Sequence, residues 1–160
     1  MKNKFLKTVF LTLAAVVCFA LFLLLRQNEL HIEKTVPAVS AENYNNLISN
    51  SEYESLTATI NLTINKNVFW ISKAYGEISV NNKIYSVYLN SGDRTQLENM
   101  IICQVKDKYS SNSRNGWLYI TKDFSEYVMV VKDMSGEICE IIIFPCENNK
   151  SAEKILRECY

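Results

Sequence analysis

The sequence predicts an α+β fold, in which an N-terminal transmembrane helix precedes an antiparallel-sheet domain of about six to seven strands with two or three packed helices. Three observations lead to this expectation. Residues 5–25 are almost wholly apolar, segments of alternating apolar and polar residues recur between residues 57 and 144, and apolar residues at helical spacing flank those segments. Hairpins separated by helices are typical of an antiparallel α+β domain.

The stretch from Phe5 to Leu25 is the most strongly biased part of the chain. A helix of this length reaches ~31 Å, close to the ~30 Å hydrocarbon core of a bilayer. The stretch is longer than the apolar core of a cleaved signal and has no small-residue site close behind it. We therefore expect an uncleaved signal-anchor, with the lipid bilayer as a partner through Phe5 to Leu25.

The charges around this stretch set an orientation and a domain plan. Lysines gather at its amino-terminal end, so the positive-inside rule places residues 1–4 in the cytoplasm. Residues 5–25 would be the transmembrane anchor, 26–40 a linker, and 41–160 an extracytoplasmic α+β domain. Abundant asparagine, lysine and isoleucine indicate an AT-rich bacterial genome, hence the bacterial inner (cytoplasmic) membrane.

The charge balance argues against nucleic acid as a partner. The chain has 17 Lys+Arg and 17 Asp+Glu, and several of the basic residues belong to the anchor and its flanks. The outer domain is therefore mildly acidic and contains no basic run. A protein that binds nucleic acid ordinarily presents a clustered basic surface.

Taken in order, the outer domain shows alternating strand and helix signals. We expect a helix over 41–55, capped by Ser40, and a second helix over 93–108, with Asp93 and Gln96 forming a capping box. A closing helix over 151–159 would face the sheet with Ala152, Ile155, Leu156 and Cys159. The expected strands are 57–66, 68–75, 77–80, 83–89, 116–121, 126–132 and 138–144.

Two details within these strands carry specific expectations. Asn81 and Asn82 tolerate positive φ, so they predict a tight hairpin between 77–80 and 83–89. Residues 141–144 are apolar on both faces, so that strand should be buried in the middle of the sheet.

Four cysteines lie in the outer domain and raise the question of a disulfide. Cys139 and Cys146 bracket one strand and are too far apart to bond to each other. A closing helix that runs back along this strand would bring Cys159 towards its first half, so we favour Cys139–Cys159, with Cys146–Cys159 second. Free thiols are the alternative, and Cys103 has the weakest case for pairing.

The sequence shows no catalytic constellation, and we assign no catalytic, cofactor-binding or metal-ligating residue. The single histidine, His31, lies in the expected linker, and the chain contains only four glycines and no glycine-rich phosphate loop. Two pairs of acidic residues, Asp123 with Glu126 and Asp133 with Glu137, flank expected hairpin turns, where carboxylates are ordinarily solvated. The protein is therefore predicted not to be an enzyme.

Aromatic residues are the richer signal, because several fall on strands where some must point outward. The candidates for an interaction surface are Trp70, Tyr88, Trp117 and Tyr119. Exposed tyrosine and tryptophan clusters are common at protein-binding hot spots. Cross-strand aromatic pairs that merely stabilise a sheet are the alternative interpretation.

Three segments of the chain form a recognisable combination: residues 57–89 (TATINLTINKNVFWISKAYGEISVNNKIYSVYL), WLYITKDFSEYVMVV and IIIFPC. They resemble the FidL-like family of small bacterial membrane-anchored proteins. The chain lacks the cysteine before the first strand that this family would show. The resemblance implies a periplasmic companion or sensor of a membrane-bound transcriptional regulator, without catalytic residues.

Together these observations predict a single-pass, membrane-anchored, non-enzymatic protein whose outer domain binds another membrane or envelope protein. A companion of a membrane-bound regulator is one alternative. A secreted enzyme or inhibitor, released by signal cleavage after Ala41, is another.

Overall fold

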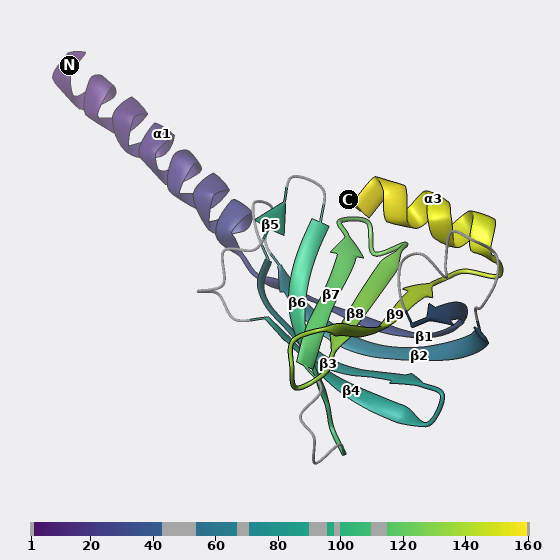
Figure 1. The fold of residues 1–160 in the computed structure, drawn as a ribbon. Helices are drawn as coiled ribbons and strands as arrows, with labels where there is room; N and C mark the ends of the chain where they lie inside the picture. The colour runs from purple at the N-terminus through teal and green to yellow at the C-terminus, as the bar shows by residue number, and fades with distance from the viewer. Residues whose placement is uncertain are drawn as a thin grey trace.

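The protein is an antiparallel β-barrel with a long helix at one end and a short helix on its outer face (Figure 1). The computed structural model describes residues 2–42, 54–66, 71–89, 96–97, 100–109 and 115–159. These residues form α1 (Lys2–Leu25), β1 (Asn28–Ala41), β2 (Glu54–Lys66), β3 (Ile71–Val80), β4 (Lys83–Leu89), β5 (Gln96–Leu97), β6 (Met100–Asp107), β7 (Asn115–Thr121), β8 (Tyr127–Lys132), β9 (Ile138–Phe144) and α3 (Asn149–Cys159).

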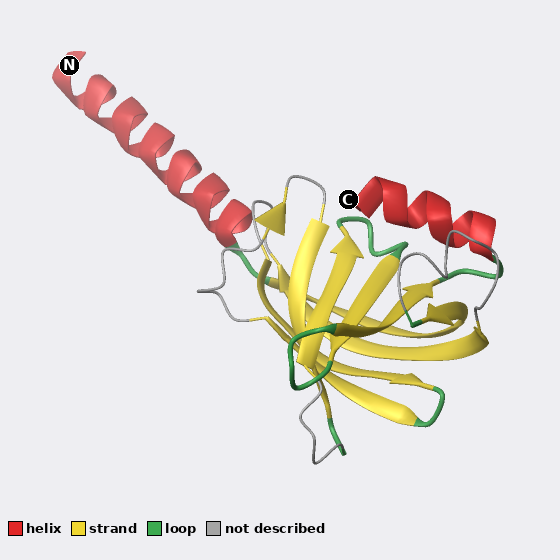
Figure 2. Cartoon of the chain, in the orientation of Figure 1, coloured by secondary structure: helices red, strands yellow, loops and turns green. Residues whose placement is uncertain are grey.

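The sheet closes on itself because β4 pairs with β6. The strand order is β4-β3-β2-β1-β9-β8-β7-β6, every pairing is antiparallel, and β5 adds two residues to the free side of β6. Eight strands therefore form the closed barrel. The expected α+β fold is wrong: strands dominate the described chain, and Figure 2 shows helices only as α1 and α3, outside the barrel.

Side chains fill the barrel, because alternate residues of every strand point inward. In β2, Ala58, Ile60, Leu62 and Ile64 are all fully buried, as the sequence pattern predicted. Large residues complete this interior cluster, and the rings of Tyr127 and Phe144 stack with centroids 5.2 Å apart. The interior is thus a packed core.

A second apolar layer lies outside the barrel, where α3 packs on β8 and β9. This outer cluster joins Ala152, Ile155 and Leu156 of α3 to residues such as Val130 and Ile141. The predicted closing helix and its buried face are confirmed, although the Cys159 side chain lies outside the described residues. The prediction that residues 141–144 are buried in the middle of the sheet is confirmed as well, since β9 lies between β1 and β8 and its two faces meet the interior cluster and the outer cluster.

Where the structure describes the segment expected to be a helix over 93–108, it is strand, as β5 and β6. Ile101, Cys103 and Val105 point inward and are buried, whereas Ile102 and Gln104 between them point outward. The helical spacing of Met100, Ile101 and Val105 coexists with this two-residue period, and the pairing of β6 with β4 and β7 decides between them.

The expected linker over 26–40 is also strand. β1 pairs with β2 over thirteen residue pairs, from Asn28–Lys66 to Ser40–Glu54. Its many charged residues and Pro37 concealed a regular alternation in which Leu30 and Ile32 pack against the interior cluster. The helix expected over 41–55 lies mostly outside the described residues, and its ends belong to β1 and β2.

The hairpin between β3 and β4 agrees with expectation, but the strand boundary expected at Gly76 is absent. Asn81 and Asn82 have φ of 47° and 62° and form the predicted tight turn between β3 and β4. Residues 71–80 form one continuous strand rather than two. Gly76 makes this possible, since its φ is +149° and a Cβ there would lie 2.1 Å from the Asn61 carbonyl oxygen.

Helix α1 projects away from the barrel (Figure 1). Within the part of the chain that the structure describes, no helix is both long enough and apolar enough to cross a membrane. The prediction of a transmembrane helix over residues 5–25 is corrected by this finding.

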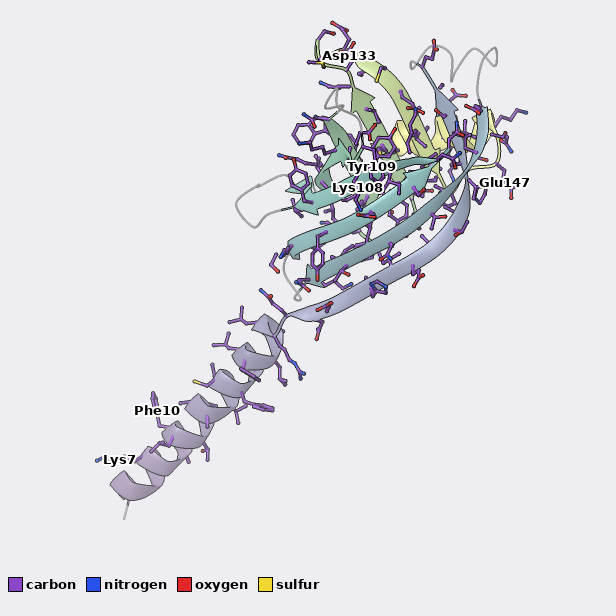
Figure 3. The ribbon with its side chains drawn as sticks, turned by 90° about the horizontal axis from the view of Figure 1, so that it is seen from below. Lys7, Phe10, Lys108, Tyr109, Asp133 and Glu147 are labelled. Carbon is purple, nitrogen blue, oxygen red and sulfur yellow. The ribbon has the colours of Figure 1, made fainter. Side chains whose placement is uncertain are left out.

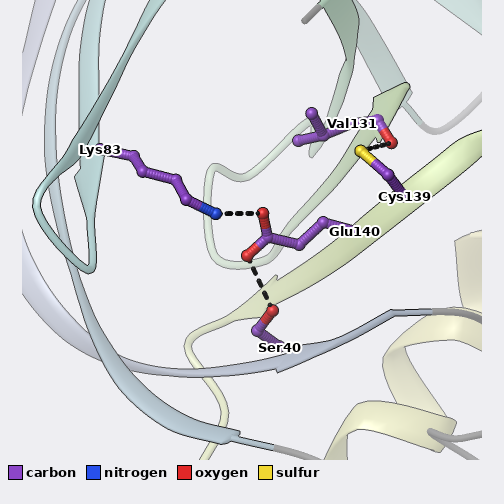
Figure 4. Close-up of polar contacts among 5 residues, drawn as sticks. All are labelled: Ser40, Lys83, Val131, Cys139 and Glu140. Atoms are coloured by element: carbon purple, nitrogen blue, oxygen red, sulfur yellow. Dashed lines mark hydrogen bonds and ion pairs between the residues drawn. The ribbon is translucent and has the colours of Figure 1, made fainter. Parts of the chain in front are cut away.

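Polar contacts tie the barrel together near each end. Ser40 Oγ donates a hydrogen bond to Glu140 Oε1 at 3.0 Å, and Lys83 Nζ donates to Glu140 Oε2 at 2.8 Å, which links β1, β9 and β4 (Figure 4). Near the α1 end, Lys34 Nζ donates to the Phe124 carbonyl oxygen at 3.1 Å. Partial burial lowers the pKa of Lys34, an effect that the nearby Asp123 carboxylate opposes.

Replacing the shared acceptor should weaken the barrel. Glu140→Ala leaves the buried Ser40 hydroxyl without its acceptor and removes the partner of Lys83. We expect a loss of about 1–3 kcal/mol in the free energy of unfolding, measured by urea denaturation. The matched control is Glu137→Ala, whose side chain is exposed. Equal urea midpoints for the two variants would contradict this role for Glu140.

Candidate functional site

An open groove on the outer surface of the barrel is the candidate site. It has a volume of about 460 Å³ and lies between the outer faces of β4, β6 and β7 and the turn that joins β8 to β9. We call it the aromatic groove. Its lining residues are Tyr88, Gln104, Val105, Asn115, Gly116, Trp117, Lys132, Asp133, Met134, Ser135 and Gly136.

Tyr88, Gln104 and Trp117 of the groove belong to a row of side chains that crosses four strands. Tyr75 is opposite Tyr88, Tyr88 is opposite Gln104, and Gln104 is opposite Trp117. Residues directly opposite each other in antiparallel strands point to the same face, so all four lie outside the barrel. Three strand spacings give the row a length of about 14 Å.

The alternation of each strand forces these aromatic residues outward. In β7, Leu118 and Ile120 are fully buried in the interior cluster, so Trp117 on the same strand faces outward. In β4, Tyr85 and Val87 occupy the interior in the same way. Tyr75 and Tyr88 consequently keep 40% and 38% of their surface exposed, which is a large fraction for such residues.

Gly116 fixes how closely β7 approaches β8 beside Trp117. A Cβ at this position would lie 2.0 Å from the carbonyl oxygen of Val130, a contact that only glycine avoids. Gly116 is on the inward face of β7, since it is opposite Val105 and Val131 of the interior cluster, so this close approach fixes the spacing of the strands that carry the groove.

The Asp133 carboxylate holds the turn that forms the far wall of the groove. Asp133 Oδ1 accepts hydrogen bonds from Ser135 Oγ at 2.6 Å, from Ser135 N at 2.8 Å and from Glu137 N at 3.1 Å. The Ser135 hydroxyl bond is the largest cause of a lowered Asp133 pKa. The turn presents the Met134 side chain, 75% exposed, at the rim.

The groove lies away from α1. Figure 3 shows Asp133 at the opposite end of the molecule from Lys7 and Phe10 of α1. A partner could therefore occupy the groove without meeting the helix.

The structure brings together only part of the predicted interaction surface. Tyr88 and Trp117 line the groove. Tyr119 is also on β7, but it packs against the outer cluster beneath α3. Trp70 lies outside the described residues. Sequence reasoning missed Gln104, because its segment was taken for a helix, and it missed Met134, because turn residues carry no periodic signal.

The predicted disulfides are not formed. Cys139 and Cys146 are free thiols. A shift of register between β8 and β9 turns Cys139 towards the interior cluster, where its Sγ donates to the Val131 carbonyl oxygen at 3.5 Å, rather than towards α3 (Figure 4). Cys146 is buried under α3, and burial raises the pKa of its thiol. Cys103 is buried inside the barrel, and burial raises its pKa to about 12.

The described residues contain no group of three or more His, Cys, Asp or Glu side chains that could hold a metal ion. His31 sits on the outer face of β1, where its Nδ1 lies 3.2 Å from Thr63 Oγ1. No protein-family model, curated protein or solved structure matches the chain. The FidL-like resemblance accordingly stays a prediction.

The hydrogen bonds of Asp133 give the turn a pH dependence. The folded-state pKa lies below the ordinary value of 3.8, so this stabilisation is present above that value and is lost as the pH falls through the lowered pKa. Asp133→Asn removes the titration. We expect the parent protein to lose more unfolding free energy than the variant between about pH 5 and pH 2, by urea denaturation at each pH. Parallel pH profiles would contradict this assignment.

Proposed function

We propose that the protein is a non-enzymatic binding protein, and that the aromatic groove holds a segment of a partner protein of the membrane or envelope. The observation that carries the proposal is the outward-facing row of Tyr75, Tyr88, Gln104 and Trp117 on a barrel whose interior is already filled. Aromatic side chains that the core does not need remain available for contact. Tyrosine and tryptophan are enriched among the residues that dominate protein-binding energy.

The chemistry of the groove favours binding over catalysis. Its one carboxylate, Asp133, is engaged by three donors of its own turn, which lowers its pKa and leaves it a weak base. The remaining polar groups, Gln104, Asn115 and Lys132, suit hydrogen bonds to a peptide backbone or to polar side chains. Met134 at the rim adds a flexible apolar contact.

The position of β1 favours a chain that is not cut after Ala41. Cleavage there would remove β1, which pairs with β2 over thirteen residue pairs and with β9 at residues 39–41. The barrel would lose one of its eight strands and the cover over part of its core. A binding protein that keeps its N-terminal segment therefore fits this fold better than a domain released at that site.

The surface of α1 supports the lipid bilayer as a second partner. Its described side chains from Val9 to Leu25 are exposed and predominantly apolar, with Phe10 75% and Leu11 72% exposed. Exposed apolar side chains are more stable where something other than water covers them. We propose that α1 contacts lipid and so keeps the barrel close to a bilayer.

Site-specific photo-crosslinking in the native host tests the groove. A photoreactive residue at Gln104 should crosslink to one protein, whereas the same residue at Thr59, on the exposed face of β2, should not. Trp117→Ala should reduce the Gln104 crosslink about tenfold or more, the effect of losing a binding hot spot. Tyr109→Ala, which removes an exposed tyrosine outside the groove, is the matched control.

The identity of the crosslinked protein then decides between the partner classes. A membrane-bound transcriptional regulator would support the companion role that the FidL-like resemblance implies. Equal crosslinking from Gln104 and Thr59, or a Trp117→Ala yield equal to that of Tyr109→Ala, would overturn the groove as the binding site.

Vesicle flotation tests the lipid contact. The full chain should float with phosphatidylcholine–phosphatidylglycerol vesicles, and a variant with Leu11→Lys and Val16→Lys should stay in the dense fractions, because charged side chains oppose burial in hydrocarbon. The control carries the same added charge on the barrel, as Thr59→Lys and Asn61→Lys. Flotation of the α1 variant to the same extent as the control would contradict the proposal.

A further inference from the structure

Within the described residues, one edge of β1 stays open over most of its length. β1 pairs with β2 along almost its whole length, but it pairs with β9 only at Val39, Ser40 and Ala41. β9 ends at Phe144 and Pro145 follows, so the ladder between the two strands stops there. One further bond joins the chains, from Cys146 N to the Pro37 carbonyl oxygen at 2.9 Å. Before Pro37, the second edge of β1 has no backbone partner among the described residues.

The bond to Pro37 shows which backbone groups face this edge. Neighbouring residues of a strand direct their N–H and C=O groups to opposite sides, and the Pro37 carbonyl points towards β9. Every second residue before Pro37 therefore points the same way, and the residues between them point towards β2. The open edge of β1 consists of the N–H and C=O groups of Glu29, His31, Glu33 and Thr35.

Pro37 itself agrees with this geometry. Proline has no N–H to donate and is found in sheets on edge strands, with the missing donor on the unpaired side. Its N faces the open edge rather than β2, so the long ladder with β2 keeps all of its donors. Residues 28–41 can thus form a regular strand although they contain a proline.

We propose that the open edge of β1 binds an extended segment of another protein. The bound segment would add a strand to the sheet beside the part of β1 that β9 does not reach. Backbone hydrogen bonds at strand spacing are what such a segment offers, and this mode of binding needs no preformed pocket. This proposal does not depend on the aromatic groove, which lies on other strands.

The side chains of β1 specify the chemistry of the segment. On the inner face, Leu30, Ile32 and Val36 are only half-buried and pack against the interior cluster, so apolar residues of an added strand would complete their cover. On the outer face, Glu29 and Glu33 are exposed, so basic residues opposite them would form cross-strand ion pairs. The segment should therefore alternate apolar and basic residues.

The same side chains oppose a second copy of this chain as the occupant. Antiparallel pairing of two β1 strands about His31 would set Glu29 of one copy opposite Glu33 of the other, and like charges directly opposite destabilise a sheet. Lys34 adds a charge on the inner face, where it is held by the Phe124 carbonyl oxygen. Charges of this kind are how natural edge strands avoid self-association.

Amide hydrogen exchange of the full chain in a non-ionic detergent tests the proposal. The probe is a ten-residue peptide of alternating valine and lysine, and the control peptide alternates valine and glutamate. With the valine–lysine peptide, exchange at the amides of Glu29, His31, Glu33 and Thr35 should slow by about tenfold or more, because each gains a hydrogen bond. The amides that already bond β2, those of Leu30 and Ile32, should not change.

A pair of variants separates backbone binding from simple charge attraction. Glu33→Pro removes one N–H of the open edge without touching the ladder to β2, and Glu33→Thr removes the same charge but keeps the N–H. Protection by the peptide should persist in Glu33→Thr and disappear in Glu33→Pro. Unchanged spectra elsewhere in the barrel establish that both variants are folded.

Four results would overturn the proposal. One is the absence of slowed exchange at these four amides with the valine–lysine peptide. The second is equal protection by the valine–glutamate peptide, and the third is equal protection in Glu33→Pro. The last is protection of the edge without any peptide that rises with protein concentration, since this would identify a second copy as the occupant.

Discussion

The hydrogen-bonded pairing of β4 with β6 is the interaction on which the rest of the structure depends. It joins Tyr85, Ser86, Val87 and Tyr88 to residues 104–107 and converts a long meander into a closed barrel. Closure divides every strand into an inner and an outer face. The side chains of the inner faces form the core, so the aromatic residues of the outer faces lie outside it. The aromatic groove lies across the pairing of β4 with β6, because Tyr88 comes from β4 and Gln104 from β6. One pairing thus forms both the core and the candidate site.

Much of the sheet could be read from the sequence, and the errors share a physical cause. The alternation in residues 57–66, the asparagine turn and the apolar run over 141–144 are local signals, and each was interpreted correctly. β6 and β1 were missed because their identity depends on partners distant in the chain. Met100, Ile101 and Val105 fit helical spacing until β4 and β7 impose a two-residue period. Residues 28–41 look like a polar linker until β2 pairs with them.

The candidate site was predictable only in its aromatic members. Tyr88 and Trp117 could be selected from the sequence because they are large aromatic residues on predicted strands, where alternation turns some side chains outward. Their neighbours Gln104 and Met134 have no such signature, since one depends on the register of β6 and the other on a turn that Asp133 organises. The disulfide prediction failed for a similar reason: a shift of register at β8 and β9 turns Cys139 to the other face of its strand. A slip of one residue in a ladder reverses every such assignment.

The direct passage from α1 into β1 also determines how the molecule bears a load. Only Arg26 and Gln27 separate the helix from the strand, and Arg26 N still bonds the Phe22 carbonyl oxygen at 3.0 Å. A force that pulls on α1 therefore acts along β1. It loads the thirteen residue pairs of the ladder between β1 and β2 together, instead of opening the pairs one after another. When two paired strands are pulled along their length, all the hydrogen bonds between them share the force. The barrel is thus attached to its helix through the longest ladder it has.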